Sequence, residues 1–370
     1  MSKSRVMSEM IRHSSSSVNK SDFRYINKLA QDNYVGYGAL SRELERRLAG
    51  KFSREEAILT GSGEDALALA LHQLQSCNPN KDEVVVSSYV CAAVVNAVLS
   101  QGLRPVFADV ALDSLNLGVE DIRVNRLTGK TLAIICSHMG GYPDDINAAM
   151  KLGVPVISDC AQAIGSTIAG AQLISLGDMS ITSFGSTKFL TAGLGGAVFC
   201  DERNANAIRR LATSELSVSD YQEQGFVQTQ GQHFSDLNAG LGLSQLARLE
   251  HFLQKRRRIA EKYDRVLSGM RGVSFPKKIF GAEPNWFRYY FLTDRADEWR
   301  CRLLTKGVDA RTSISHVMTD YFPRKAKRAE LAKQSKRVIS LPIYPELKAV
   351  QIAHILRVLK SVAIEISEAV

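Results

Sequence analysis

The sequence predicts an α/β fold built on a mostly parallel mixed sheet. Short apolar runs begin near residues 57, 83, 104, 131, 154 and 180 and alternate with segments of helical pattern. This alternation is typical of parallel strands joined by helices that cover the sheet. The 370 residues are enough for a large domain and a smaller one. We assign residues 1–33 to an N-terminal arm and first helix, residues 34–245 to the large domain, and residues 246–370 to a small α+β domain.

The composition is ordinary for a globular enzyme. Hydrophobic residues make up 45% of the chain and charged residues 23%, as in most soluble proteins. A net charge of +9 could indicate a nucleic-acid partner. The basic excess lies in residues 255–258, in residues 324–336 and near the N-terminus, without interleaved aromatic residues. We therefore interpret it as solvated helix faces and expect no nucleic acid, although a basic rim would also suit a diphosphate-bearing substrate.

Cysteine usage and hydropathy predict a cytoplasmic protein. The cysteines show no CxxC spacing, and most lie in apolar runs, at positions 77, 91, 136, 160, 200 and 301. This pattern indicates buried, reduced thiols and no metal site. No apolar stretch reaches the roughly 18 to 20 residues of a membrane span. The N-terminus is polar and lacks the apolar core of a secretion signal, so we expect a flexible or loosely packed arm there.

The first elements lead to a candidate anion site. Residues 22–32 and 40–48 have helical patterns, and the second is amphipathic, as in a surface helix. A short strand over residues 57–60 is followed by Gly61, Ser62 and Gly63, which open a helix over residues 64–74. A glycine turn from strand to helix presents free backbone N–H groups and the positive end of the helix dipole. These features together favour anion binding.

The next segments complete one half of the sheet. Residues 83–87 are a predicted strand and residues 88–100 a largely apolar helix, and further strands are predicted at residues 104–109 and 131–137. His138 follows the last of these at the same sheet edge. Two interpretations of His138 stay open, namely a loop residue satisfied by the backbone and an active-site residue.

The central stretch carries the candidate chemistry. A strand over residues 154–158 delivers Asp159, and a strand over residues 180–184 delivers Ser183. A tight turn then leads to Lys188, and glycines at residues 193–196 allow a close approach of the backbone. Ligands of open α/β sheets bind at the carboxyl ends of the strands. Pyridoxal phosphate (PLP) needs a lysine for its aldehyde, a carboxylate for its ring nitrogen and a site for its phosphate, and these residues supply all three.

The same stretch resembles a known family. It resembles the DegT/StrS family of PLP-dependent sugar aminotransferases, which have the aspartate aminotransferase fold (fold type I). The motifs that carry the resemblance are DCAQAIGS, which begins at Asp159, then GD, then SFGSTK, which ends at Lys188, and then GLGGAV. The likeness runs from about residue 34 to about residue 362. It implies that Lys188 forms a Schiff base with PLP and moves the proton, and that Asp159 pairs with the pyridinium nitrogen. It also implies that Gln162 contacts the phenolic oxygen and that Ser183 binds the phosphate. Lys188 argues against the family's dehydratase branch, which has a histidine there.

Three departures from the family pattern bear on cofactor binding. Where the family has Gly-Thr, this chain has Gly63 and Glu64, whose carboxylate would repel a phosphate. Either Glu64 turns to solvent while Ser62 and backbone amides bind, or Ser183 holds the phosphate mainly by itself. Where the family has an aromatic residue that stacks on the ring, this chain has Cys91. Either Tyr89 covers the ring, or Cys91 makes a van der Waals contact.

A third departure lies in the long polar segment of residues 214–232. In the family this region reaches the phosphate of the neighbouring subunit with an asparagine, which is missing here. Gln230, Gln232 or His233 could replace it.

The remaining chain predicts the small domain. Residues 236–266 form one or two long helices that link the domains, apolar runs occupy residues 286–292 and 338–343, and further helices are expected at residues 298–306 and 349–362. The resemblance places Arg311 and His316 in the substrate-facing region. The alternative for both is a surface or packing role.

The resemblance implies a transaminase that moves an amino group from an amino-acid donor, glutamate, to a keto sugar linked to a nucleotide. A homodimer with shared active sites is expected. Two alternatives remain: an aminotransferase acting on a non-sugar ketone, and a PLP-binding protein without turnover that serves as a partner or regulator. A nicotinamide enzyme is disfavoured because no GxGxxG motif follows the first strand.

Overall fold

The computed structural model describes residues 10–32, 35–212, 234–312 and 329–368. Its centre is a seven-stranded sheet in the order β1-β9-β8-β5-β4-β2-β3. The strands are β1 (Glu56–Thr60), β2 (Glu83–Ser87), β3 (Arg104–Ala108), β4 (Thr131–Cys136), β5 (Val156–Asp159), β8 (Met179–Ser183) and β9 (Gly196–Cys200). Strands β3, β2, β4, β5 and β8 pair in parallel, whereas β9 is antiparallel to both β8 and β1. The mostly parallel mixed sheet is thus confirmed.

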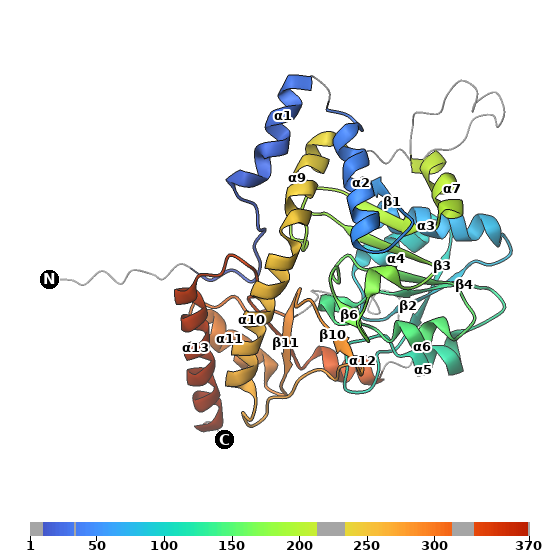
Figure 1. Cartoon of the computed structure of the whole chain (residues 1–370). Helices are drawn as coiled ribbons and strands as arrows, with labels where there is room; N and C mark the ends of the chain where they lie inside the picture. The colour runs from blue at the N-terminus through green and yellow to red at the C-terminus, as the bar shows by residue number, and fades with distance from the viewer. Residues whose placement is uncertain (1–9, 33–34, 213–233, 313–328, 369–370) are drawn as a thin grey trace, which may run out of the picture.

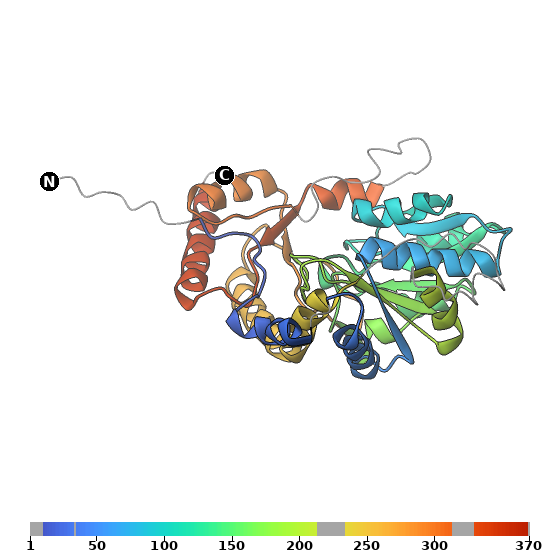
Figure 2. The same cartoon turned by 90° about the horizontal axis from the view of Figure 1, so that it is seen from above.

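Helices cover both faces of this sheet (Figure 2). They are α2 (Ala39–Lys51), α3 (Gly63–Cys77), α4 (Ala92–Ser100), α5 (Val119–Asp121), α6 (Ile146–Met150) and α7 (Glu202–Ala212). Successive strand side chains point to opposite faces, so Val85 packs in the core that contains α2, and Val84 and Val86 pack in the core that contains α3 and α4. The predicted helix from residue 88 begins only at Ala92, because the Ser88 amide still donates to Ala108 O, at 2.8 Å, beyond the end of β2.

The small domain is an α+β unit on the other side of a long helical link. Helices α9 (Asp236–Ala247) and α10 (Leu249–Leu267) run from the large-domain core into the small-domain core, as the gold helices of Figure 1 show. The small domain contains α11 (Ala296–Thr305), α12 (Ala329–Ser335), α13 (Ala349–Glu368) and the antiparallel pair of β11 (Tyr289–Leu292) and β12 (Val338–Leu341). The exact domain boundaries stay a prediction.

Short elements fill the connections. A three-stranded sheet joins β6 (Thr167–Ile168), β7 (Ala171–Gln172) and β10 (Ala282–Glu283). Single turns are η1 (Lys20–Phe23), η2 (Ile122–Arg126), η3 (Met139–Gly141) and η4 (Leu173–Ser175). None of the described helices has the length and apolar character that crossing a membrane requires.

The N-terminal segment is packed in its described part, so the expectation of a loose arm is wrong there. The Ile11 side chain is buried, its N–H donates to Gly307 O at 2.9 Å, and its carbonyl accepts from Asp309 N at 3.0 Å. Further along, the buried carboxylate of Asp22 pairs with Arg248 at 2.6 Å, just before α1 (Arg24–Asp32). Sequence polarity suggested mobility, but these few apolar and acidic side chains anchor the segment to both domains.

Candidate active site

A cavity lies at the carboxyl edge of the large sheet. Asp159 is the last residue of β5 and Ser183 the last of β8, and the two strands pair in parallel. Their carboxyl ends therefore meet at one edge. The cavity has a volume of about 240 Å³, and its walls are formed by Ser62, Gly63, Glu64, Leu67, Cys91, Ala93, Val94, Ser137, Met139, Asp159, Ala161, Gln162, Ile181, Ser183 and Lys188.

The loop that carries Lys188 is closed by backbone hydrogen bonds. The Lys188 N–H donates to Gly185 O at 2.9 Å, and at the base of the loop Ala192 N donates to Phe184 O at 2.9 Å. The Lys188 Nζ lies 5.9 Å from the centroid of the Phe287 ring, which belongs to the segment before β11. The amine is thus held between the large-domain sheet and an aromatic residue that precedes the small-domain strand.

Asp159 lines the same cavity, and few groups of the protein compensate its negative charge. Its carboxylate is buried, and among the described residues the structure records one hydrogen bond to it, from Ala161 N at 2.9 Å. Burial raises the pKa of Asp159 to about 6, while the Ala161 amide and the positive charge of Lys188 act in the opposite direction. A buried carboxylate with free acceptor positions is suited to a protonated ring nitrogen.

The orientation of Gln162 is fixed by its neighbours. Its Oε1 accepts from Gly140 N at 2.9 Å, so the Nε2 group points the other way, toward Cys91 Sγ at 3.2 Å and Met139 Sδ at 3.8 Å. Two sulfur atoms are weak acceptors. The amide N–H of Gln162 therefore remains available for a stronger acceptor, such as the phenolic oxygen that the family resemblance assigns to it.

Of the two residues considered for the ring face, Cys91 lines the cavity. Burial raises the pKa of its thiol, which is therefore protonated at neutral pH. Tyr89 does not line the cavity and is instead buried in the core that the large domain shares with the small domain. The structure thus favours van der Waals contact from Cys91 over cover by Tyr89.

The start of α3 and the glycine loop approach Ser183 closely. A Cβ on Gly63 would lie 2.7 Å from Ser183 Cβ, and a Cβ on Gly196 would lie 2.4 Å from Ser62 O. Glycine is therefore required at both positions. Ser62 caps α3, because its Oγ accepts from Asp65 N at 3.0 Å. The first N–H groups of a helix lack helical acceptors and attract anions, so this corner suits a phosphate.

Glu64 reaches the rim of the cavity with an exposed side chain. Burial and the neighbouring Asp65 raise the pKa of its carboxyl group. The exposure allows the side chain to turn to solvent, which was one of the two expectations for this departure from the family pattern.

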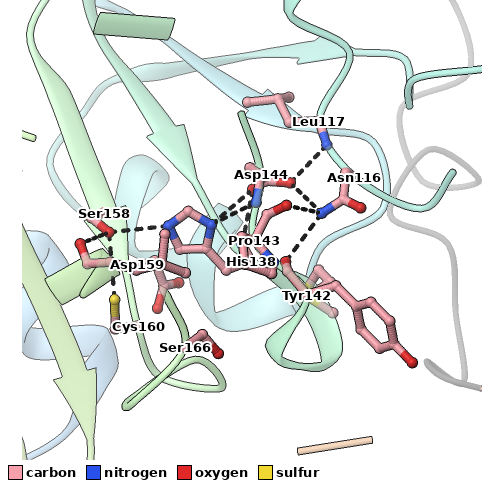
Figure 3. Close-up of polar contacts among 12 residues, drawn as sticks. Asn116, Leu117, His138, Tyr142, Pro143, Asp144, Ser158, Asp159, Cys160 and Ser166 are labelled. Atoms are coloured by element: carbon pink, nitrogen blue, oxygen red, sulfur yellow. Dashed lines mark hydrogen bonds and ion pairs between the residues drawn. The ribbon is translucent and has the colours of Figure 1, made fainter. Parts of the chain in front are cut away.

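His138 is part of a buried network of hydrogen bonds (Figure 3). Its Nδ1 accepts from Asp144 N at 2.9 Å, so its Nε2 carries the proton and donates to Ser158 Oγ at 3.0 Å. Burial lowers the pKa of the imidazole, which is neutral. The residue does not line the cavity. Of the two open interpretations, the structure favours a loop residue satisfied by its surroundings.

The other substrate candidates lie elsewhere. Arg311 makes two hydrogen bonds to the Asp309 carboxylate, at 2.9 and 2.6 Å, and lines a second cavity of about 640 Å³ instead of the first. His316, Gln230, Gln232 and His233 lie outside the described residues.

Sequence reasoning missed two residues from the segment before β11. Phe287 lies beside Lys188, and the guanidinium of Arg288 stacks 4.5 Å from the Phe287 ring centroid. One signal was present, since Arg288 is the single charge within the apolar run of residues 286–292. A charged residue in an otherwise buried segment is more often functional than its neighbours.

The cavity therefore fits PLP. The lysine amine can hold the aldehyde, and the carboxylate with free acceptor positions can hold the ring nitrogen. The oriented amide can contact the phenolic oxygen, and the glycine-lined start of the helix can hold the phosphate.

The chain is similar to known aminotransferases in sequence and in fold. The chain is 30% identical over 342 residues to the dTDP-4-dehydro-2,3,6-trideoxy-D-glucose 4-aminotransferase of Saccharopolyspora spinosa, covering 85% of this chain and 87% of that protein. The aminotransferase TlmJ of Streptoalloteichus hindustanus superposes with a TM-score of 0.88 at 24% identity, covering 96% of this chain and 100% of that one. DesV of S. venezuelae superposes with a TM-score of 0.84 at 25% identity, covering 93% and 94%.

A family model adds the decisive comparison, because it matches residues 16–360, nearly the whole chain. The enzyme class and cofactor predicted from the sequence are thereby confirmed. The chain belongs to the DegT/DnrJ/EryC1/StrS aminotransferase family, whose members depend on pyridoxal phosphate.

Proposed function

We propose that this aminotransferase moves an amino group from L-glutamate to a keto sugar linked to a nucleoside diphosphate. The relative from Saccharopolyspora spinosa, whose printed name gives a dTDP-linked keto sugar as substrate, supports the acceptor class. The donor and the carbon that receives the amine are part of the proposal.

The observation that carries the proposal is that Lys188 and Asp159 line the same cavity. Bound PLP would supply an electron sink for the carbon that loses and gains the proton. Lys188 would attach the cofactor through Nζ and, once released, move the proton between carbon atoms at that same Nζ. Asp159 would hold the ring nitrogen in its protonated form through charge attraction.

The remaining wall residues would position the cofactor. Gln162 would donate from Nε2 to the phenolic oxygen, and Ser183, Ser62 and the amide of Gly63 would bind the phosphate at the start of α3. Cys91 and Met139 would exclude water from the ring face. His138 has no contact role in this proposal, and roles for Arg311 and His316 in substrate binding stay predictions.

The test uses the purified protein reconstituted with PLP. With L-glutamate and a nucleoside diphosphate 4-keto sugar, we expect the aminated sugar and an equal amount of 2-oxoglutarate by mass spectrometry, and no product with Lys188→Ala. Amination of a small keto acid or cyclic ketone, with the nucleotide sugar left unchanged, would refute the sugar acceptor. Cofactor binding without any conversion by amino acids would favour the partner or regulator alternative.

We also propose a cytoplasmic homodimer with active sites shared between subunits. Twofold pairs are the commonest closed assemblies, and all six cysteines are unbridged, as in a reducing compartment. Light scattering after size-exclusion chromatography checks the dimer, and a monomer with full activity would contradict it.

A further inference from the structure

Arg288 lines the second cavity, of about 640 Å³, and its backbone is connected to the cofactor cavity through Gly140. Its N–H donates to Gly140 O at 2.9 Å, and Gly140 N in turn donates to Gln162 in the cofactor cavity. Its guanidinium stacks 4.5 Å from the centroid of Phe287, and Lys188 Nζ lies 5.9 Å from the same centroid. The guanidinium and the amine are therefore separated by no more than the sum of these distances.

The other charges of the second cavity are compensated. Arg311 pairs with Asp309 at 2.6 Å, and Arg300 pairs with Asp297 at 3.4 Å. His13 is buried, and this burial together with Arg288 and Arg311 lowers its pKa to about 3, so it is neutral at pH 7. Its Nε2 is within 2.8 Å of Ser340 Oγ.

Arg288 differs from these neighbours. Among the residues that the structure describes, no hydrogen bond or ion pair is recorded for its guanidinium, and its recorded contact is the stack on Phe287. Arginine stays protonated in proteins. A partly buried guanidinium without a counter-ion is costly unless a ligand supplies the negative charge.

We propose that Arg288 binds the carboxylate of the amino-acid donor. This inference rests on the proposed function, because it names a residue that recognises one of its substrates. One uncompensated guanidinium matches the single charge of a carboxylate, and the planar fork of arginine forms two parallel hydrogen bonds with it. A diphosphate carries more charge than one guanidinium balances, and Arg300 and Arg311 are already paired.

Geometry favours the same assignment. The carboxylate of an amino acid is bonded to the carbon that carries the amino group, and this carbon must come close to Lys188 Nζ during transfer. Both the guanidinium and the amine lie close to the Phe287 ring, at 4.5 and 5.9 Å from its centroid, so an anion held by Arg288 would lie near the carbon that reacts at Lys188. Binding there would orient the donor before the proton is moved.

The test compares two donors that differ only in this carboxylate. L-glutamate carries it, and 4-aminobutanoate is the same molecule without it. We expect Arg288→Gln to lower kcat/KM of the donor half-reaction with L-glutamate by roughly 10²-fold, and to change the value for 4-aminobutanoate by less than about threefold. Arg288→Lys, which retains one charge but not the fork, should recover part of the loss.

Two controls separate this role from damage to the fold. Arg123→Gln removes an exposed cation that is paired with Glu120 and lies outside both cavities, and should leave donor kinetics unchanged. The absorbance spectrum of the PLP-loaded Arg288→Gln variant should match that of the wild type. A third readout needs no turnover: calorimetry on the cofactor-free protein should show weaker succinate binding to Arg288→Gln than to the wild type.

Several results would overturn the inference. These are an equal loss with both donors, an unchanged kcat/KM with L-glutamate together with unchanged succinate affinity, or an effect confined to the KM of the nucleotide sugar. Failure of the proposed function itself would look different, because the wild type would then convert neither donor, and the succinate comparison would still decide the role of Arg288.

Discussion

Asp144 and Asp159 are both buried carboxylates near the carboxyl ends of neighbouring strands, β4 and β5, but their surroundings differ. Asp144 is 2% exposed and accepts hydrogen bonds from His138 N at 2.9 Å, Leu117 N at 2.8 Å and Asn116 Nδ2 at 3.1 Å (Figure 3). Asp159 is 5% exposed and has one recorded hydrogen bond among the described residues.

This difference separates a structural carboxylate from a functional one. The donors around Asp144 use its acceptor capacity within the protein, and they tie the loop after β4 to the residues around Leu117. Asp159 keeps acceptor capacity for a ligand, and the cost of its burial remains in the ligand-free protein as a raised pKa. Unused hydrogen-bonding capacity, more than burial, marks the active site here.

The largest expected effect comes from Lys188→Ala, which tests the cavity that contains Asp159. Removing Nζ abolishes covalent attachment of the cofactor and the proton transfer at that atom. We expect transamination to fall by at least roughly 10⁴-fold, measured as 2-oxoglutarate formed per enzyme. Lys151→Ala, which changes an exposed lysine, is the matched control and should retain full activity. Activity in Lys188→Ala near that of the wild type would refute the site assignment.

The variants Asp159→Asn and Asp144→Asn test whether the first carboxylate is functional and the second structural. Asp159→Asn should lower kcat by roughly 10³-fold, since the ring nitrogen loses its counter-charge, while the ligand-free protein loses no stability. Asp144→Asn should instead lower the free energy of unfolding by about 1–3 kcal/mol, because its NH₂ group faces buried donors. Urea unfolding and steady-state kinetics measure the two effects. Equal losses of activity in both variants would contradict the division into a functional and a structural carboxylate.

The buried charge of Asp159 should also make the free energy of unfolding depend on pH. Folding raises the pKa of Asp159 from 3.8 to about 6, so the folded ligand-free protein holds this proton more tightly than the unfolded chain. The cost of the buried charge is absent below pH 3.8, grows as pH rises, and is complete above pH 6, where it amounts to about 3 kcal/mol.

The measurement is the difference in unfolding free energy between Asp159→Asn and the wild type, both without cofactor. Because asparagine does not titrate, this difference should increase in favour of the variant between pH 4 and pH 7. A difference that stays constant over this range would show that neighbouring groups compensate the charge of Asp159 in the folded state.

The smallest expected effect concerns the phosphate corner. Gly63→Ala places a methyl group 2.7 Å from Ser183 Cβ, and overpacking of this kind costs about 1–3 kcal/mol. Because Ser183 must move, we expect PLP to bind roughly tenfold more weakly, measured by fluorescence titration. Gly50→Ala in α2, where no described atom outside the helix's own backbone and the adjacent residues lies within 4 Å of the new Cβ, is the control and should bind PLP normally. Normal binding by Gly63→Ala would argue against a phosphate at this corner.

Local sequence pattern was sufficient for most of the fold. Each predicted strand is present, because buried parallel strands are short apolar runs and stand out between helical patterns. Strand β9 was missed, because the glycines of residues 193–196 indicated a loop and the strand, which begins at the last of them, is only five residues long. The packing of the N-terminal segment was missed because it depends on partners such as Gly307, far along the chain.

The sequence by itself determined the central chemistry of this protein, since Asp159, Ser183 and Lys188 follow adjacent strands and the carboxyl ends of such strands share one edge. Only the tertiary structure decided that Cys91 lines the cavity while Tyr89 does not, and that His138 is satisfied by Asp144 and Ser158. It also showed that Arg288 has no recorded counter-ion among the residues whose positions are described. The physical reason is that a residue type fixes which bonds a side chain can make. Whether those bonds are already made depends on neighbours that the chain brings together from distant positions.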